Sequence, residues 1–336
     1  MSETLKNIVK FTVLLAFGLL LFWLVYRNMD IEKIKEGLQN VKYSYLVFAM
    51  FLGILSHISR AIRWNYLLQP MGYKPKTVNT FFAVMVMYLA NMALPRLGEV
   101  SRCTIMERYE KIPFGKSLGT VVAERSADMF MLLLFTVLVV ITQFTTVSSF
   151  IANNPEIQSN FQKFISSGNK LALLGAIGLA LAVIAYFLIK KFLSQKLYAK
   201  IKSLALSVFE GFKSIFKMQK SLLFILHSFI IWTLYFVMVY VAFFAFPATE
   251  HLTLSMALTV FVFSSYGMVA PVQGGIGAWH AMVIATLVFY QVDFNQAGAF
   301  AFVVHGLNTL TLISLGLVSL ALLPVVNKTK NAQNKG

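Results

Sequence analysis

The chain has 336 residues, of which 58% are apolar and only 12% are charged, and its formal net charge is +16. With a strongly positive mean hydropathy, these proportions exclude an ordinary water-soluble domain and indicate an integral membrane protein. A nucleic-acid partner is excluded as well, because no soluble segment is long enough to present a basic face.

Six stretches are long and apolar enough to cross a bilayer, since a spanning helix needs about 20 mostly apolar residues. They are residues 8–27, 45–67, 119–143, 170–189, 222–246 and 298–324. Three more, residues 78–95, 252–270 and 278–291, are short or flanked by Pro and Gly, which predicts broken or re-entrant helices. We therefore predict an all-α, polytopic helical bundle of about seven to nine hydrophobic segments, in one integral membrane domain over residues 1–336.

The first stretch follows Lys6 and Lys10 like a signal sequence, but it lacks a small-x-small cleavage pattern, so we interpret it as a retained signal anchor. Lysine and arginine in short loops indicate the cytoplasmic side. The lysine-rich loop 190–221 and the C-terminal tail are therefore predicted to be cytoplasmic, and the Ser/Thr/Asn/Gln-rich loop 144–169 to lie outside. The expected location is the plasma (inner) membrane.

The orientation of the N-terminal half depends on whether residues 78–95 cross the bilayer or fold back. If they fold back, the N-terminus is inside and residues 29–44 lie outside as an amphipathic segment. Its apolar stripe at helical spacing consists of Ile31, Ile34, Leu38 and Val41.

An internal repeat is predicted around residues 79–102 and 255–280, where an apolar run ends twice in Pro-x-x-Gly. Proline ends a helix and glycine permits a tight reversal, and the freed backbone groups must bind protein, water or ligand. The two breaks are either ordinary turns or mark a binding site at the membrane midplane. The amides of Gly274, Gly275 and Gly277 are expected at a helix N-terminus, where a phosphate or carboxylate is favoured.

Charged residues within the apolar segments need individual explanations, because each costs about 2.5–3.5 kcal/mol on insertion scales. Glu124 and Asp128 are four residues apart and share a helix face, and Arg125 can pair with Asp128 three residues on. This group is either a cluster at the membrane interface that satisfies itself, or a site for a cation or headgroup that faces the bundle interior.

Segment 45–67 carries His57, Arg60 and Trp64 on one face, beside Arg63. Two interpretations are open. The arginines reach bulk-lipid phosphates while the tryptophan lies in the interfacial belt, or Arg60 or Arg63 binds the phosphate of a substrate through its guanidinium group.

Each break is followed by polar residues. Glu99 and Arg102 are three residues apart if a helix restarts after the first break, and with Arg96 they place both signs of charge at one re-entrant tip. His280 follows the second break, and His305 lies in the last segment. Each histidine is either a satisfied polar contact or a proton relay.

No enzyme motif stands out. The sequence contains no Gly-x-Ser-x-Gly, His-Glu-x-x-His, Walker loop or nucleotide-binding fingerprint, so ATP-driven transport by this chain alone is not expected. Cys103 is the single cysteine, which excludes an intrachain disulfide and cysteine-based metal centres. We therefore predict no catalytic residue, no cofactor and no metal site.

Four motifs in a fixed order resemble the lysylphosphatidylglycerol synthase transmembrane region, a flippase-like integral membrane family. They are Arg63-Trp64, Asn91-x-x-Leu94-Pro95-x-x-Gly98-Glu99-x-x-Arg102, Glu124-Arg125-x-x-Asp128 and Pro271-x-x-Gly274-Gly275-Ile276-Gly277. The resemblance covers nearly the whole chain. It implies a duplicated bundle with two re-entrant breaks that moves a lipid, such as an aminoacylated phosphatidylglycerol or a polyprenyl-phosphate glycolipid, between leaflets.

Two departures from that family limit what the resemblance implies. Aminoacylating members carry a large soluble synthetase domain, whereas this sequence ends at Gly336 soon after its last segment, so lipid aminoacylation is not implied. Members commonly have an acidic residue shortly after the second glycine-rich turn, where this sequence has Trp279-His280.

The leading hypothesis is a flippase-like protein that binds or translocates an anionic lipid, aminoacylated or polyprenyl-phosphate-linked. Arginines and the second-break amides would bind the phosphate, and the acidic residues would bind a cationic moiety or balance the arginines. The predicted substrate-binding residues are Arg60, Arg63, Asn91, Arg96, Glu99, Arg102, Glu124, Arg125, Asp128, Gln273, Gly274, Gly275, Gly277 and His280.

Two other functions stay open from the sequence alone. One is a membrane-embedded enzyme acting on a lipid-linked phosphate or sugar, with Glu124 or Asp128 as base or metal ligand. The other is a scaffold that assembles partners. The expected partner is a membrane lipid with an anionic headgroup, and a homo-oligomer or a separate lipid-modifying enzyme is left open.

Overall fold

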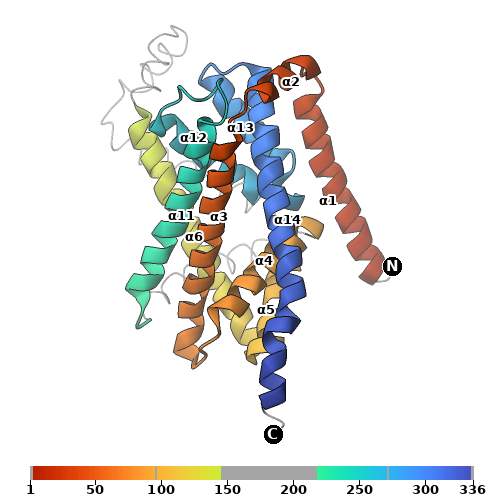
Figure 1. Ribbon diagram of the computed structural model, residues 1–336, viewed down its shortest axis with the longest axis vertical. Helices are drawn as coiled ribbons and strands as arrows, with labels where there is room; N and C mark the ends of the chain where they lie inside the picture. Colours follow the sequence, from red (N-terminus) through yellow and green to blue (C-terminus); the bar gives the residue numbers. More distant parts are fainter. Residues whose placement is uncertain (1–2, 95–96, 145–217, 271, 334–336) are drawn as a thin grey trace, which may run out of the picture.

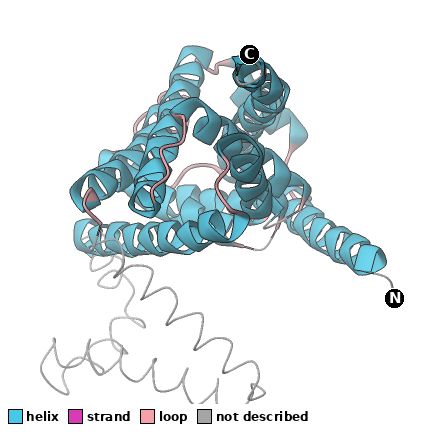
Figure 2. Ribbon diagram, turned by 90° about the horizontal axis from the view of Figure 1, so that it is seen from below, coloured by secondary structure: helices cyan, strands magenta, loops and turns pink. Residues whose placement is uncertain are grey.

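The computed structural model describes residues 3–94, 97–144, 218–270 and 272–333, and every regular element in this part of the chain is a helix (Figure 2). The all-α prediction is confirmed. In chain order the elements are α1 Glu3–Tyr26, α2 Ile31–Gln39, α3 Tyr43–Leu68, η1 Gln69–Met71, α4 Thr77–Ala93, α5 Leu97–Glu110, α6 Phe114–Thr142, α11 Ser221–Phe243, α12 Leu254–Val269, η2 Gln273–Gly275, α13 Ala278–Phe289 and α14 Phe294–Gln333.

Four helices within the described ranges are long and apolar enough to cross a membrane: α3 with η1, α6, α11 and α14. The end of α1 and α2 form a fifth candidate, bent by 86°. These helices match predicted segments 8–27, 45–67, 119–143, 222–246 and 298–324. Predicted segment 170–189, loop 144–169 beyond its first residue, and residues 190–217 of the basic loop lie outside the described residues.

The three short hydrophobic stretches belong to two helical hairpins, α4–α5 and α12–α13, which lie toward opposite ends of the bundle (Figure 1). Figure 1 shows α4 and α5 in its lower half and α12 and α13 in its upper half, with α14 running past both. Residues 78–95 therefore fold back rather than cross. The two breaks lie against each other, because a Cβ added to Gly274 would be 3.8 Å from Met92 Cγ. The predicted internal repeat stays a prediction.

Buried apolar side chains form two clusters that follow these two ends. The larger cluster joins α11 to α12, α13 and the first turns of α14, with Phe243 and Phe300 at its centre. The smaller one joins α3, α4 and α6 around Trp64 and Met85. Close approach of α14 to α4 depends on Gly316, where an added Cβ would lie 2.7 Å from Leu89 Cβ.

The amphipathic segment after α1 is largely as predicted. Ile34, Leu38 and Val41 pack against the larger cluster, whereas Ile31 is 67% exposed. Asp30 caps α2 by accepting a hydrogen bond from the backbone N–H of Glu32 at 2.9 Å. This short helix lies across the beginning of α14 (Figure 1).

Candidate functional site

The candidate site is a group of buried charges centred on Glu124, which α6 directs into the bundle. Glu124 Oε1 accepts hydrogen bonds from Arg60 Nη1 at 2.8 Å and from Arg63 Nη2 at 3.3 Å. Its Oε2 accepts from Arg102 Nη1 at 2.7 Å. The side chain of Glu124 is only 2% exposed. One carboxylate therefore joins three arginines from α3 and α5.

Asp128 continues this group one helical turn further along α6. Its Oδ2 accepts from Arg60 Nη1 at 2.9 Å, and its Oδ1 lies 2.8 Å from Arg63 Nη2. Trp232 Nε1, on α11, approaches the same Oδ1 at 3.4 Å. The predicted shared face of Glu124 and Asp128 is confirmed, and it faces the interior.

Neighbouring side chains fix the arginines. The Arg102 guanidinium group lies over the Trp64 ring, 4.5 Å from its centroid, and Trp64 Nε1 donates to Thr120 Oγ1 at 2.7 Å. Arg63 Nη1 donates to Ser228 Oγ at 3.0 Å. Because Trp64 and the Arg63 side chain are fully buried, the first of the two open interpretations, in which they lie at the lipid interface, does not hold. Helical spacing identified the face of α3 but not whether it met lipid or protein.

Arg125 is the exception in the charged group. It pairs with Glu99 on α5, and its side chain is 50% exposed. The predicted pair of Arg125 with Asp128 is therefore wrong. Arg125 is one residue beyond Glu124, which turns it about 100° around the helix and away from the interior. Glu99 and Arg102 are both on α5, so the predicted restart of a helix after the first break is confirmed.

The buried group carries unsatisfied polar atoms and an excess of positive charge. Arg60, Arg63 and Arg102 outnumber the two carboxylates, which leaves a net charge of +1. Among the described residues of α5, three buried side-chain atoms have no hydrogen-bond partner: Arg102 Nε, Arg102 Nη2 and Glu99 Oε2. Nε of Arg60 and of Arg63 are unpartnered as well. Such buried polar atoms are rare and need an explanation.

The first break is closed by its own residues. Asn91 Oδ1 accepts a hydrogen bond from the backbone N–H of Gly98 at 2.8 Å. A Cβ on Gly98 would lie 2.2 Å from the Met87 carbonyl oxygen, so only glycine fits. Asn91 therefore bridges α4 and α5. Arg96, the remaining predicted residue at this tip, lies outside the described residues.

At the second break, the amides of two of the three glycines form hydrogen bonds within the chain. Gly274, Gly275 and Gly277 have φ of 57°, 77° and 80°, in the left-handed region. The Gly277 N–H donates to His280 Nδ1 at 3.4 Å, and the Gly275 N–H donates to the Val272 carbonyl oxygen at 3.4 Å. The expectation that these two amides are open to an anion is corrected by these bonds. Gln273 is buried in η2.

The histidines of the second half lie together, although they are distant in sequence. The ring centroids of His280 and His305 are 4.5 Å apart, and His305 Nε2 lies 2.9 Å from the Gly274 carbonyl oxygen. Phe22 and Tyr26 of α1 pack against the His280 ring in T-shaped arrangements. Within the described ranges these contacts join the second break to α1, and none of them involves the arginines of the charged group.

Several neighbours of the charged group were not predicted. Tyr88 and Tyr235 place their hydroxyl oxygens 3.4 Å apart, and Tyr235 OH lies 3.4 Å from His57 Nδ1. Ser228, Trp232 and Tyr235 recur at spacings of four and three on α11, and this polar stripe in an apolar helix was the available signal. In the part of the chain that the structure describes, no group of three or more His, Cys, Asp or Glu side chains is arranged to hold a metal ion.

Comparison with known proteins agrees with the motif order noted above. A family model described as the lysylphosphatidylglycerol synthase transmembrane region matches residues 8–316. A UPF0104 membrane protein of Methanocaldococcus jannaschii is 30% identical over 137 residues, which are 40% of this chain and 41% of the relative. The chain thus matches less than half the length of that relative. No solved structure gives a significant match.

Proposed function

The chain belongs to the lysylphosphatidylglycerol synthase transmembrane region family, and we propose that it binds an anionic lipid headgroup at the buried arginine cluster and translocates it between leaflets. One observation carries the proposal: Arg102 is 1% exposed, yet its Nε and Nη2 have no partner. Buried charged donors without a partner are costly, and an oxyanion with two oxygens would satisfy both.

The position of the cluster suits a lipid headgroup. Glu124 lies five residues after residue 119, where the predicted apolar segment begins, which is about 7.5 Å along the helix axis into a hydrocarbon core about 30 Å thick. A headgroup crossing hydrocarbon alone loses its hydration, so fixed charges at this depth lower the barrier. Such a polar region is supplied by the carboxylates of Glu99, Glu124 and Asp128 together with four arginines: Arg60, Arg63, Arg102 and Arg125.

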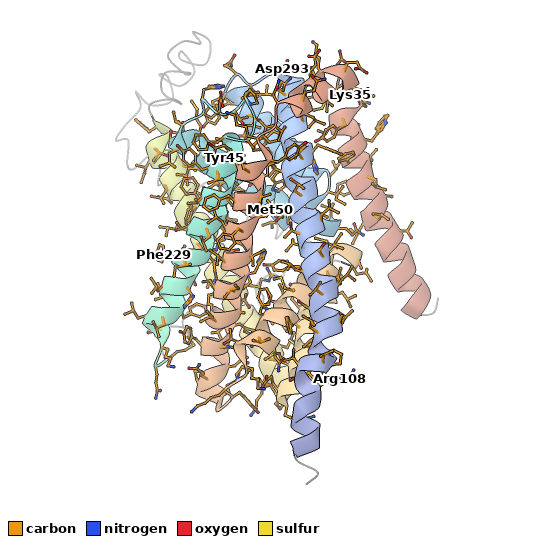
Figure 3. The ribbon with its side chains drawn as sticks, viewed as in Figure 1. Lys35, Tyr45, Met50, Arg108, Phe229 and Asp293 are labelled. Carbon is orange, nitrogen blue, oxygen red and sulfur yellow. The ribbon has the colours of Figure 1, made fainter. Side chains whose placement is uncertain are left out.

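Charge at the bundle ends supports an orientation. Figure 3 places Arg108 at the end opposite Lys35 and Asp293. At the Arg108 end lie the short connections that contain Lys74, Lys76 and Lys111, the first turn of α6 with Lys116, and Lys220 directly before α11. We propose that this end is cytoplasmic, together with the C-terminus.

The geometry favours binding over the alternative of a membrane-embedded enzyme. Glu124 and Asp128 both accept from buried arginines, which lowers their capacity to act as a base or a metal ligand. Positively charged groups around a carboxylate hold it in the ionised, paired form. The role of Glu124 and Asp128 is then to position the arginines.

The test compares two arginines of α5. Wild type, Arg102→Gln and Arg108→Gln are purified in mild detergent and their co-purifying lipids are quantified by mass spectrometry. We expect an anionic lipid to be enriched with wild type and Arg108→Gln, because Arg108 is exposed, and to fall about tenfold or more with Arg102→Gln.

Arg102→Lys guards against a folding defect, since it keeps the charge but removes the two-donor edge. Enrichment that is equal in all variants would exclude the cluster as the binding site. Translocation is then measured as the change in headgroup accessibility of a labelled lipid in proteoliposomes, with no covalent change in the lipid.

A further inference from the structure

We propose that His280 is a proton-sensitive contact, which holds α1 against the second break while the ring is neutral and releases α1 when the ring takes up a proton. The proposal does not depend on the proposed function. It draws on three features: the hydrogen bonds of His280 and His305, the apolar sequence of the segments around them, and the way in which α1 is attached to the other helices.

The hydrogen bonds of the closed break define which ring nitrogens carry protons. His280 Nδ1 accepts from the Gly277 N–H at 3.4 Å, so this nitrogen is unprotonated and the ring proton is on Nε2. His305 Nε2 lies 2.9 Å from the Gly274 carbonyl oxygen and is the protonated nitrogen of that ring, while its Nδ1 lies 3.4 Å from Thr309 Oγ1. Both rings therefore satisfy their contacts in the neutral form.

A second proton affects the two rings differently. On His305 it would go to Nδ1, where the Thr309 hydroxyl group can turn to accept it. On His280 it would also go to Nδ1, but there it would face the Gly277 N–H and replace a hydrogen bond by two opposed donors. His280 is the third residue of α13, so a positive charge on it also opposes the helix dipole. Of the two histidines, His280 is the proton-sensitive one.

Among the described residues, nothing around His280 provides a counter-charge. The ring packs against other rings from three helices: Phe22 and Tyr26 of α1, Trp279 of α13 and His305 of α14. Of these, Tyr26 and His305 are titratable, and Tyr26 OH donates to the Gly298 carbonyl oxygen at 3.1 Å. No Asp, Glu, Lys or Arg occurs in the segments that pack around the break, which are residues 11–26, 77–94, 254–289 and 294–323. Because burying an unpaired imidazolium group is costly, the closed break excludes it.

The attachment of α1 depends on this site. Figures 1 and 2 both show α1 projecting away from the other helices toward its N-terminus. Among the described elements, its main packing partners are η2 and α13. A Cβ on Gly277 would lie 2.6 Å from the Gly18 carbonyl oxygen, and Phe22 and Tyr26 pack on the His280 ring. A charge on His280 therefore disturbs both the turn and the aromatic contacts that hold α1.

The direction of the effect follows from proton linkage. Imidazole in water takes up a proton as the pH falls through about 6.5, whereas the closed break admits none. A proton therefore binds to the released state and stabilises it. One histidine of this kind raises the ratio of released to closed protein about thirtyfold between pH 7.5 and pH 5. Acidification releases α1, and neutral or alkaline pH keeps it docked.

The first experiment measures how often the second break opens. Hydrogen exchange of the backbone amides of residues 275–281 is followed by mass spectrometry on the full chain in lipid nanodiscs at pH 7.5 and pH 5, and the intrinsic pH dependence of exchange is divided out. For wild type we expect about thirtyfold less protection at pH 5. His280→Gln keeps an acceptor for the Gly277 N–H but takes up no proton, so its protection should be equal at the two pH values. His251→Gln, which removes an exposed histidine outside the break, should behave like wild type.

A permanent charge provides the second test. His280→Lys should be as weakly protected at pH 7.5 as wild type is at pH 5. Spin labels on Val13→Cys of α1 and Leu310→Cys of α14, both exposed positions, should lie further apart in His280→Lys than in the otherwise unchanged chain at pH 7.5, with Cys103→Ala in both proteins.

Three outcomes would each overturn the inference. They are protection of the wild-type break that does not change with pH, a pH response that survives His280→Gln, and equal spin-label distances with and without His280→Lys. The last comparison does not require that His280→Gln folds. Lipid binding at the arginine cluster is untouched by any of these results, so the proposed function stands or falls separately.

Discussion

The two helix breaks share the pattern Pro-x-x-Gly, and both bind freed backbone groups within the chain, but the polar side chains beside them differ. At the second break, the amides of Gly275 and Gly277 and the carbonyl of Gly274 bind the chain itself, through Val272, His280 and His305. Near the first break, Arg102 and Glu99 keep open donors and an open acceptor. Similar sequence patterns therefore lie beside satisfied polar groups in one half and beside a candidate binding region in the other.

The largest effect is expected from Glu124→Gln, which tests the region near the first break. The change leaves Arg60 and Arg63 with Asp128 but removes the acidic partner of Arg102, so we expect the free energy of unfolding to fall by about 3–5 kcal/mol. Steric trapping in lipid bicelles measures it. Glu250→Gln, in an exposed pair with Lys42, is the control. Equal stability of the two variants would show that the ion pairs of Glu124 do not stabilise the fold.

The next largest effect is expected at the second break. Gly277 has φ of 80°, and a Cβ there would lie 2.6 Å from the Gly18 carbonyl oxygen of α1. We expect Gly277→Ala to cost about 1–3 kcal/mol from backbone strain, with a further loss from the displacement of α1. Gly72→Ala is the control, since Gly72 has φ of 85° but an added Cβ meets nothing within 4 Å.

The amount of lipid that co-purifies with Gly277→Ala tests whether the second break takes part in lipid binding. Gly277→Ala should leave the co-purified anionic lipid unchanged, because Gly277 contacts α1 and His280, whereas Arg102 contacts Glu124 and Trp64. Loss of lipid in this variant, at unchanged fold, would contradict the division between a structural break and a binding region.

A smaller effect is expected from Asn91→Ala at the first break. It removes the acceptor of the Gly98 N–H, so we expect stability to fall by about 1 kcal/mol, and Asn91→Asp, which keeps an acceptor oxygen, to fall less. The same unfolding assay ranks the three proteins. A loss as large as that of Glu124→Gln would mean that Asn91 contributes more than this bridge.

The smallest effect is expected outside the membrane segments. Lys42 Nζ donates to Glu250 Oε2 at 2.7 Å, and this hydrogen bond raises the pKa of Lys42 above its usual value. A raised lysine pKa stabilises the fold below the usual pKa, about 10.4, and this contribution is lost as the pH rises through the raised value. Thermal melting of wild type and Lys42→Met should thus differ slightly at neutral pH and converge at strongly alkaline pH.

Hydropathy predicted the described spans and breaks, because the energetic demands of the bilayer act on local sequence. Partners were harder to predict. Arg125 was assigned to Asp128 by local spacing, but its partner is Glu99, 26 residues away on another helix. Spacing fixes the face of a helix on which a side chain lies, whereas the partner depends on how the helices are rotated in the bundle.

The arginines of α3 show a second limit. Arg63 and Trp64 near a helix end fit an interfacial belt as well as a buried site, and only the packing of α11 and α6 against them decides between the two. Similarly, His280 and His305 were read singly, because 25 residues separate them in sequence. Contacts between distant segments carry no periodic signal.

The close fit of Gly277 against Gly18 also has a consequence for biosynthesis. α1 is made first, but the turn that receives it is made about 260 residues later, which at roughly 5–20 residues per second is on the order of tens of seconds. α1 must reside in lipid without this partner for that interval. Its stretch from Phe11 to Tyr26 contains no charged residue, so α1 can remain in the lipid until α13 has been synthesised and the second break packs against it.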